Sequence, residues 1–347
     1  MPITVGVIAN PVSGRDIRRV AARGGVSTAE DKRNRIARAV IGAVTAGADH
    51  IIAMQEPFRI ASGALADLTV EADLEILDIG ASVAPDDTKR AALAMRERGV
   101  EVLVTLGGDG TNRTIAQVWP EVVLVPMSTG TNNVFPSLVE PTVAGAAAGL
   151  VAAGIAPLET TAPRAKMIHL DVGDGVTDLA LIDAVTLADD FVGNRMPVEP
   201  QNLRDLVVTN AKPDSIGVSS IAGLVHECRG SEDAAVRVRC GPGGQIVAAP
   251  IAPGLYRHVP VLSAERIELD QPVELVGPTV LAFDGDREHR IRADRPAVAT
   301  VRRDGPRVID VPKALAAGAE AGAFLGAAVA AEDGALVAPD LCFTAGG

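Results

Sequence analysis

The stretch VLVTLGGDGTNRTIAQV, residues 102–118, joins an apolar run to an amphipathic run through the sequence GGDGT. The apolar run predicts a buried strand, and the second run predicts a helix. Between them, Gly107, Gly108 and Gly110 allow positive φ and let a ligand approach the backbone closely. The helix that follows adds its N-terminal partial positive charge. The connection is therefore typical of an anion site, with phosphate as the natural guest.

Asp109 does not fit this site as a phosphate contact, because its carboxylate repels phosphate. It fits as a base that accepts a hydroxyl proton, or as a ligand on the magnesium side. Phosphoryl transfer from a nucleotide to an alcohol needs both functions in one place. The alternative is a tight strand-to-helix turn in which Asp109 or Thr111 caps the helix. GGDG alone does not separate the two interpretations.

Strands and helices alternate through the first 150 residues. Thr28 and Asp31 resemble a capping box at the start of the first helix. Asp86 or Asp87 can cap a later helix that ends near Gly99. The alternation predicts a parallel sheet with crossover helices. The predicted strands are 3–9, 49–54, 74–80, 100–106 and 122–127, and the predicted helices begin at residue 28, near 60, at 86 or 87, at 111 and at 142.

Two more of these strands end in small polar residues. The first strand runs into NPVSG, residues 10–14, and the strand at 122–127 runs into STGTNN, residues 128–133. The carboxyl ends of parallel strands share one edge of the sheet, where ligands bind. Three loops rich in glycine, hydroxyl and amide groups at that edge favour a nucleotide site over turn chemistry alone.

The pattern changes near residue 157. Short strand-like runs, separated by glycine, proline and aspartate, predict an antiparallel β-sandwich or barrel. A helical pattern returns after residue 311 and can pack back on the first domain. The predicted domains are 1–156, 157–311 and a C-terminal helical segment, 312–347. The strand-like runs are 166–172, 178–188, 234–240, 245–251, 266–270, 273–276, 279–283, 289–293 and 307–311.

The length of 347 residues suits two domains. With 44 acidic and 32 basic residues the formal charge is −12, which excludes general binding of nucleic acids or anionic membranes. Three cysteines without CxxC spacing suit a reduced interior. The N-terminus lacks the pattern of a signal peptide, and the apolar stretch 321–331 is too short to span a bilayer. We expect a soluble, cytoplasmic protein without stable membrane insertion.

Together, NPVSG, LGGDGT and STGTNN resemble the NAD kinase and diacylglycerol/sphingosine kinase superfamily. Within it, the chain is most similar to the ATP-NAD kinase-like branch encoded with acetoin-catabolism genes. The resemblance runs from the N-terminus through most of the second domain. It implies a Rossmann-like nucleotide-binding domain followed by a β-sandwich domain. It also implies ATP and Mg²⁺ as cofactors, a small-molecule hydroxyl acceptor, and a homo-oligomer formed through the second domain.

The resemblance also implies the site residues. The superfamily's GGDGT loop contacts nucleotide phosphate, and its aspartate, Asp109 here, is implicated in activating the acceptor hydroxyl. FDGD, residues 283–286, resembles a DGE-like turn of lipid-kinase relatives, which would bring Asp284 to the cleft, although Asp-Gly also favours a type I′ hairpin turn. No metal ligand is assigned. The implied nucleotide-binding residues are Asn10, Ser13, Gly14, Gly107, Gly108, Gly110, Thr111, Thr129, Gly130, Thr131 and Asn132.

The identity of the acceptor stays open. The Asn-Glu pair and the TPTGSTAY-like segment with which NAD kinases hold their dinucleotide are absent, and the corresponding regions read LIDAVTLADD and VAAPIAPGLY. The first hypothesis is a magnesium-dependent kinase with NAD as acceptor. The second is a kinase for a lipid or a small diol or alcohol. The third is a non-catalytic nucleotide-binding accessory protein of acetoin catabolism. Asp109 weighs against the third, because phosphate binding alone gives no reason for a carboxylate there.

Overall fold

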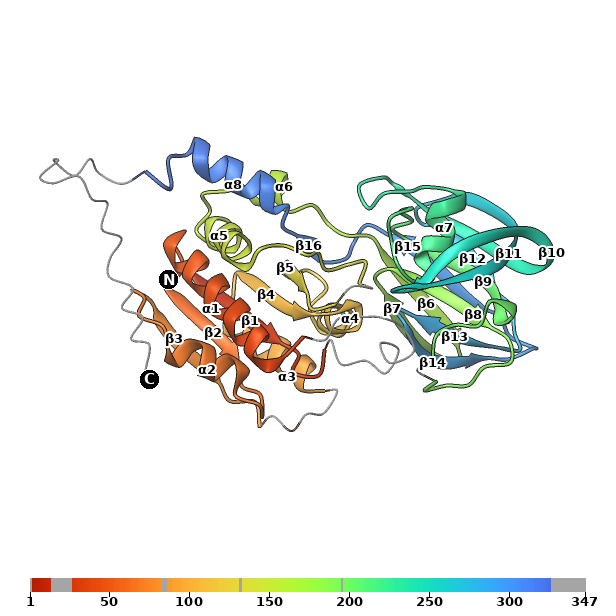
Figure 1. The fold of residues 1–347 in the computed structure, drawn as a ribbon, viewed down its shortest axis with the longest axis horizontal. Helices are drawn as coiled ribbons and strands as arrows, with labels where there is room; N and C mark the ends of the chain where they lie inside the picture. The colour runs from red at the N-terminus through yellow and green to blue at the C-terminus, as the bar shows by residue number, and fades with distance from the viewer. Residues whose placement is uncertain are drawn as a thin grey trace, which may run out of the picture.

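The computed structural model describes residues 2–13, 27–80, 82, 86–130, 133–194 and 196–325, which form two lobes (Figure 1). The first lobe holds a six-stranded sheet in the order β16-β5-β4-β1-β2-β3, and every strand pair in it is parallel. The predicted parallel sheet is therefore confirmed. Its strands are β1 (Thr4–Ala9), β2 (His50–Met54), β3 (Asp73–Leu77), β4 (Val102–Gly107), β5 (Val123–Ser128) and β16 (Arg307–Val308).

Helices cover both faces of this sheet. On one face α1 (Ala29–Thr45), α2 (Ile60–Ala66) and α5 (Pro141–Ala152) share a core with the strands, and on the other α3 (Asp87–Glu97) and α4 (Asp109–Val118) do so. Small residues let α1 and α5 touch closely, since a Cβ at Gly42 or Gly145 would collide with a backbone oxygen of the other helix. As predicted, Thr28 caps α1 by accepting a hydrogen bond from the Asp31 N–H at 3.0 Å.

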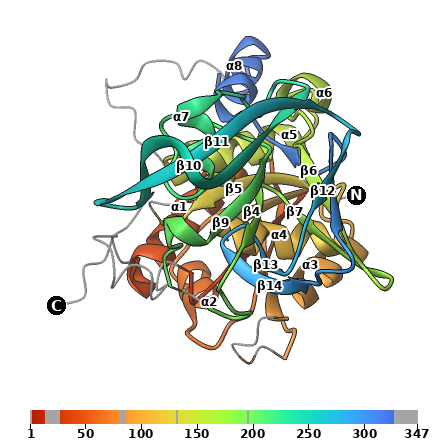
Figure 2. The same cartoon turned by 90° about the vertical axis from the view of Figure 1, so that its right-hand side faces the viewer.

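The second lobe is a sandwich of two antiparallel sheets, as predicted, in the orders β11-β10-β9-β8-β13-β14 and β12-β15-β6-β7. Apolar side chains from both sheets form one core between them. The long β10–β11 hairpin crosses the outside of this lobe (Figure 2). The strands are β6 (Met167–Gly173), β7 (Val176–Ala180), β8 (Asp183–Leu187), β9 (Leu203–Val208), β10 (Ala234–Ala252), β11 (Leu255–Glu268), β12 (Pro272–Leu275), β13 (Thr279–Phe283), β14 (Asp286–Ile291) and β15 (Ala297–Arg302).

The structure corrects several strand predictions. The run 178–188 is two strands, β7 and β8, and the runs 234–240 and 245–251 belong to the single irregular strand β10. Strands β9 and β15 were not predicted. The run 307–311 was assigned to the sandwich, but Arg307 and Val308 pair in parallel with β5 of the first lobe. Strand propensity shows that a segment is extended, whereas the sheet that it joins depends on the path of the chain.

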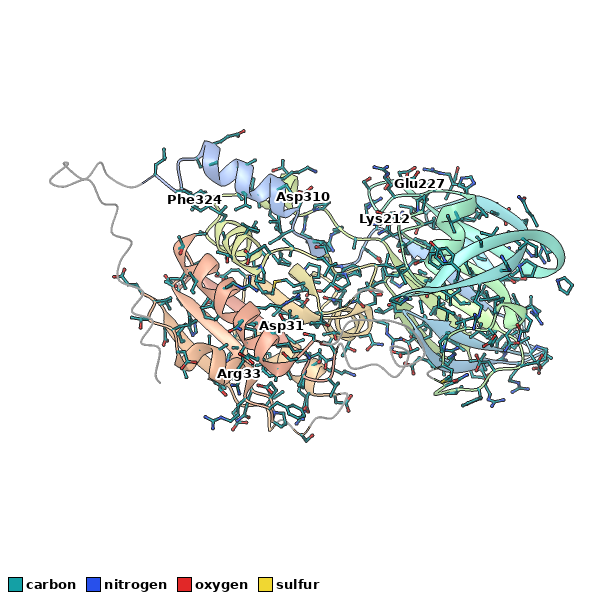
Figure 3. All side chains as sticks on the ribbon, viewed as in Figure 1. Asp31, Arg33, Lys212, Glu227, Asp310 and Phe324 are labelled. Carbon is teal, nitrogen blue, oxygen red and sulfur yellow. The ribbon has the colours of Figure 1, made fainter. Side chains whose placement is uncertain are left out.

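The chain therefore crosses between the lobes twice, after α6 (Leu158–Thr161) and again before β16. Helix α8 (Val311–Glu320) then packs on α5, so the C-terminal helix does return to the first domain. Asp310, which is labelled in Figure 3, caps it. Its carboxylate accepts a hydrogen bond from Lys313 N at 3.1 Å. The second crossing lies before the predicted boundary between residues 311 and 312. Among the described helices, none has both the length and the apolar character needed to cross a membrane.

Candidate functional site

The GGDGT connection joins β4 to α4, with Gly108 as the residue before the first helical turn. The positive φ that glycine allows is not used here, because none of the three glycines has positive φ, and the φ of Gly108 is −106°. Glycine is required instead because there is no room for a side chain at Gly107 or Gly108. A Cβ at Gly107 would lie 2.6 Å from the Thr111 side chain, and one at Gly108 would lie 2.9 Å from Asn133 Oδ1. Glycine is therefore required at both positions because the Thr111 and Asn133 side chains pack directly on this backbone.

The Asp109 carboxylate binds the third polar loop. Oδ1 accepts hydrogen bonds from Phe135 N at 2.8 Å and from Val134 N at 3.1 Å, and Oδ2 accepts from Val134 N at 3.2 Å. These N–H groups belong to the segment after β5, so Asp109 joins two loops. Asp109 is the first residue of α4 and follows the cap position, which Gly108 occupies. The alternative that Asp109 or Thr111 is the cap residue is therefore wrong.

Asn10 links the first loop to the second. Its Oδ1 accepts hydrogen bonds from Val12 N at 3.0 Å and Ser13 N at 3.2 Å, and its Nδ2 donates to Thr111 Oγ1 at 3.0 Å. The Ser13 hydroxyl donates to Asn10 O at 2.8 Å. The structure thus brings together Asn10, Ser13 and Thr111, as the sequence predicted. Gly14 lies outside the described residues.

A buried lysine on α1 binds the backbone of the first loop. Lys32, on α1, is 0% exposed, and its Nζ donates to the backbone oxygens of Asn10 at 2.9 Å, Pro11 at 2.8 Å and Ser13 at 2.7 Å. A buried ammonium is costly unless hydrogen bonds satisfy it, and these three carbonyls do so. Sequence reasoning missed this residue, because nothing near it in the chain distinguishes it from an exposed helical lysine.

The third loop begins at Ser128, the last residue of β5. The Ser128 hydroxyl donates to Gly130 O at 2.7 Å and accepts from Asn133 Nδ2 at 2.7 Å, while Arg35 of α1 donates to Ser128 O at 2.7 Å. Thr129 N donates to Gly107 O at 3.3 Å, which joins this loop to the glycine loop. The Thr129 hydroxyl is buried and has no hydrogen-bond partner among the described residues. Thr131 and Asn132 lie outside them.

Asp284 occupies the hairpin turn between β13 and β14. Its φ is 47° and that of Gly285 is 91°, the pair of positive values that a type I′ turn requires. Its carboxylate accepts hydrogen bonds from Leu181 N and Ile182 N at 2.8 Å each, and from Asp183 N at 3.3 Å. Burial raises the pKa of Asp284, and the Arg113 charge and these N–H groups oppose the rise. The hairpin turn that Asp-Gly predicted is therefore confirmed, with the buried Asp284 carboxylate bound to the backbone of residues 181–183. A role of Asp284 at the nucleotide stays a prediction.

One face of α4 forms the contact between the lobes. A Cβ at Gly110 would lie 3.4 Å from Asp286 Oδ2, and Arg113 Nη2 donates to Glu288 Oε1 at 2.9 Å. The same guanidinium lies 4.6 Å from the centre of the Phe283 ring and 3.4 Å from Asp286 Oδ2. Sequence reasoning missed Arg113, although its spacing from Gly110 places both on one side of a helix. The Asp109 end of α4 is thus held against the β13–β14 hairpin.

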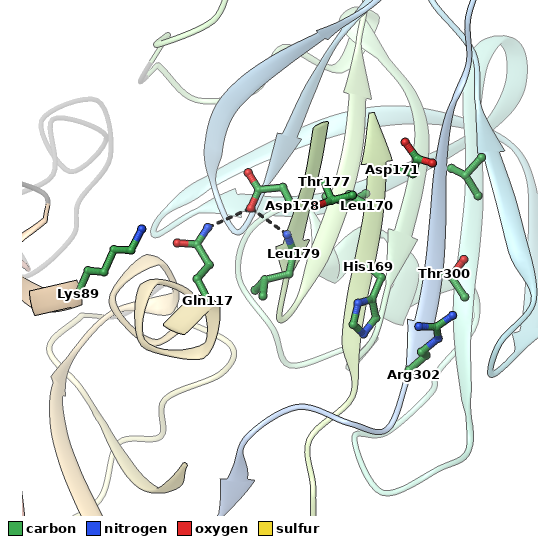
Figure 4. A pocket seen from close by; sticks show the side chains of 11 residues that line it. Lys89, Gln117, His169, Leu170, Asp171, Thr177, Asp178, Leu179, Thr300 and Arg302 are labelled. Carbon is green, nitrogen blue, oxygen red and sulfur yellow. Dashed lines mark hydrogen bonds between the residues drawn. The ribbon is translucent and has the colours of Figure 1, made fainter. Parts of the chain in front are cut away.

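A pocket of about 780 Å³ lies at the other end of α4, between Lys89 and Gln117 of the first lobe and β6, β7 and β15 of the second (Figure 4). Gln117 Nε2 donates to Asp178 Oδ1 at 2.9 Å, and Asp178 Oδ2 lies 3.0 Å from His289 Nε2. Gln117 is seven residues from Gly110, or about 10 Å along the helix axis. The pocket is therefore separate from the polar loops, and we do not place the reacting groups in it.

Few side chains near the loops could bind Mg²⁺. The described part of the chain contains no cluster of three or more histidine, cysteine or acidic side chains that could hold a metal. Mg²⁺ in phosphoryl transfer keeps several waters and binds one or two carboxylates together with substrate phosphates. Asp286, whose side chain is 42% exposed and lies next to Gly110, meets that modest requirement. Asp286 is therefore the described side chain near Gly110 that could hold a metal together with nucleotide phosphates.

Comparisons with known proteins agree with this architecture. Residues 5–155 match the model of the ATP-NAD kinase N-terminal domain, and residues 166–304 match that of the acetoin catabolism protein X C-terminal domain. The chain is 34% identical to acetoin catabolism protein X of Cupriavidus necator over 323 residues, 88% of this chain and 90% of the relative. The chain belongs to the acetoin catabolism protein X family. The predicted resemblance to NAD kinases and to their acetoin-catabolism branch is confirmed.

Two solved structures are more distant from this acetoin catabolism protein X family member. Both are candidate diacylglycerol kinases from Bacillus anthracis str. Sterne, each 11% identical, with TM-scores of 0.49 and 0.45. Each match covers 89% of this chain, and the two matches cover 97% and 98% of the chains in those structures. At this distance neither carries an argument about function. The family membership and the domain matches place the chain in a kinase-type superfamily. The two matched domains come in the order that the sequence predicted.

Proposed function

We propose that the protein transfers a phosphoryl group from ATP, with Mg²⁺, to a hydroxyl acceptor, with NAD as the first acceptor to test. The observation that carries the proposal is the joining of all three polar loops around the start of α4. Thr111 binds Asn10 of the first loop, and Asp109 binds Val134 and Phe135 after the third. Backbone N–H groups and the helix N-terminus there suit the phosphates of a nucleotide.

In the proposed reaction the Asp109 carboxylate accepts the proton of the acceptor hydroxyl. The two N–H groups that bind Asp109 orient it, and Gly108, Asp109 and Gly110 are half-buried, so the start of α4 is partly open to solvent. Asp286 would hold Mg²⁺ together with the nucleotide, and the metal would neutralise charge on the phosphates. Thr129 is a further donor for the nucleotide, because its buried hydroxyl lacks a partner among the described residues.

The test is transfer of labelled γ-phosphate from ATP to NAD, and to small diols and lipids, by the full chain and by Asp109→Asn. A base role predicts a fall in turnover of about 10²–10⁴-fold with ATP affinity unchanged. Asparagine keeps an acceptor oxygen for Val134 N and Phe135 N, so the loop contact is partly preserved. A parallel loss of ATP affinity and turnover would assign Asp109 to holding the loop. No transfer to any acceptor would remove the kinase proposal.

A non-catalytic nucleotide-binding accessory role is the second candidate. The relative's name, acetoin catabolism protein X, associates that protein with a catabolic function and names no reaction. The structure also supplies a reason for a carboxylate in a phosphate loop, since Asp109 binds two backbone N–H groups of the neighbouring segment. The presence of Asp109 therefore no longer weighs against this role. ATP binding measured by calorimetry, without turnover on any acceptor, is the result that this candidate predicts.

A further inference from the structure

A buried lysine and a buried cysteine meet in the second lobe, next to the start of β6. Lys166 is 3% exposed and Cys228 is 0% exposed, and Lys166 Nζ lies 3.7 Å from Cys228 Sγ. Both groups donate to the same backbone oxygen, Ala234 O, which lies 2.5 Å from Nζ and 3.3 Å from Sγ. Nζ also donates to Arg229 O at 3.0 Å. These acceptors hold the amine and the thiol side by side.

The surroundings of Lys166 favour the neutral form of its amine. Burial lowers the pKa of Lys166, the Cys228 sulfur opposes this change, and the Arg303 charge adds to it. A neutral amine is a nucleophile, whereas an ammonium is not. A thiol that is oxidised to a sulfenic acid becomes an electrophile that condenses with nitrogen. The Lys166 amine is therefore in contact with the sulfur atom that a peroxide would make electrophilic.

The pair lies next to a surface loop. Residues 229–231 and Asp233, which follow Cys228 directly in the chain, are exposed. Surface loops open locally at a much smaller free-energy cost than the whole fold. A small peroxide can therefore reach Cys228 when this one loop opens, without unfolding of the second lobe.

The pair also lies where the chain crosses between the lobes. Ala165, directly before Lys166, donates its N–H to Pro306 O at 2.8 Å, and Gly305 N donates to Ala165 O at 3.1 Å. The segment that enters the second lobe and the segment that leaves it are therefore paired at this point. A bond between Lys166 and Cys228 would tie these crossing segments covalently to the loop that follows Cys228.

We propose that Lys166 and Cys228 form a reversible nitrogen–sulfur cross-link when hydrogen peroxide oxidises the thiol. In the first step an S–O bond forms, the O–O bond of the peroxide breaks, and the thiol proton leaves with the second oxygen as water. In the second step the Lys166 nitrogen bonds to the sulfur, the S–O bond breaks, and hydroxide leaves with an amine proton as water. The sulfur loses the two electrons that the peroxide gains. This inference does not depend on the proposed phosphotransfer.

Mass spectrometry of the full chain tests the proposal. The folded protein would be treated with hydrogen peroxide, then unfolded in iodoacetamide, which blocks the remaining thiols. The cross-linked chain should lose two hydrogen atoms, about 2 Da, and carry one blocked thiol fewer than the untreated chain. Peptide mapping should give one species that joins the segments of Lys166 and Cys228. Dithiothreitol should release it and restore the amine and the thiol.

Lys166→Arg is the matched variant, because arginine keeps a cation and hydrogen-bond donors but its guanidinium does not deprotonate. In this variant Cys228 should stop at the sulfenic acid, which dimedone labels, and the joined peptide should be absent. Cys228→Ala keeps Lys166 and should also abolish the joined peptide, so the test stands even where Lys166→Arg does not fold. Cys240 is the internal control. It is 4% exposed and burial raises the pKa of its thiol to about 12, so it should stay reduced.

Three results would overturn the inference. The first is a Cys228 that remains a thiol in treated wild type. The second is a Cys228 that dimedone labels in wild type while no joined peptide forms. The third is an equal loss of about 2 Da in Lys166→Arg, which would show that the cysteines form a disulfide and that Lys166 takes no part.

Discussion

The Asn10 amide donates a hydrogen bond to the Thr111 hydroxyl at 3.0 Å, and this contact joins two loops that lie 101 residues apart in the chain. Asn10 also closes its own loop by accepting hydrogen bonds from Val12 N and Ser13 N. One side chain therefore sets both the shape of the first loop and its position on the glycine loop. Asn10 connects the segments that we propose to hold the nucleotide.

Asn10→Ala is expected to lower the free energy of unfolding by about 2 kcal/mol, because Val12 N, Ser13 N and Thr111 lose their partner. ATP affinity should fall with it. Asn10→Asp keeps an acceptor for both N–H groups and should preserve stability, but its charge near the phosphates should still weaken ATP binding. Urea unfolding and ATP calorimetry measure the two effects separately. Wild-type ATP affinity in both variants would contradict the placement of Asn10 at the nucleotide.

Lys32→Met should destabilise the protein by about 3 kcal/mol, since three backbone carbonyls of the first loop lose a buried donor. The measurement is urea unfolding followed by circular dichroism. Lys313→Met is the control, because the Lys313 side chain is 63% exposed and its ion pair is with Asp310, the cap residue of the same helix. The control should change stability by less than about 0.5 kcal/mol. Similar small effects in the two variants would show that the loop does not depend on Lys32.

Arg113 should couple the lobes through Glu288. Arg113→Met is expected to cost about 3 kcal/mol, because it removes a buried guanidinium from beside the buried Asp284 carboxylate. The pairwise term with Glu288 should be smaller, about 1 kcal/mol, since the Glu288 side chain is 40% exposed and solvent screens it. A double-mutant cycle with Glu288→Gln measures this term. If the effects of the two substitutions on the free energy of unfolding simply add, the contribution of Arg113 comes from another contact, for example that with Phe283.

Lys166 gives a prediction about pH. Burial lowers its pKa from 10.5, and its Nζ donates to Ala234 O at 2.5 Å and Arg229 O at 3.0 Å. Between the lowered pKa and 10.5 the unfolded chain binds more protons than the folded chain. The contribution of Lys166 to the free energy of unfolding therefore rises as pH rises through this window.

Comparing Lys166→Met with wild type isolates this contribution. The wild-type free energy of unfolding minus that of the variant should increase as the pH approaches 10.5, because only the wild type has the titrating lysine. Urea unfolding at several pH values up to 10 measures the difference, with Lys313→Met as the exposed control. A difference that stays constant, or that falls with pH, would contradict a lowered pKa for Lys166.

Several elements were predictable because their signals are local. The strand at β4, the cap of α1 at Thr28 and the hairpin turn at Asp284 each depend on residues within a few positions of one another. The role of Gly108 was not, because its lack of a side chain is required by Asn133, which lies beyond the next strand in the chain. The assignment of Arg307 and Val308 to the sandwich failed because the choice of sheet depends on how the chain returns to the first lobe.

The sequence by itself determined the order of strands and helices through the first 150 residues, the division into an α/β domain and a β-sandwich, and the three polar loops at one sheet edge. Hydrophobic periodicity and turn residues act over a few positions, so they can be read along the chain. Only the tertiary structure decided what the loop residues contact. Asp109 binds a segment 25 residues away, and Arg113 binds Glu288 across 175 residues. Such contacts arise from packing of the whole chain, so no local pattern specifies them.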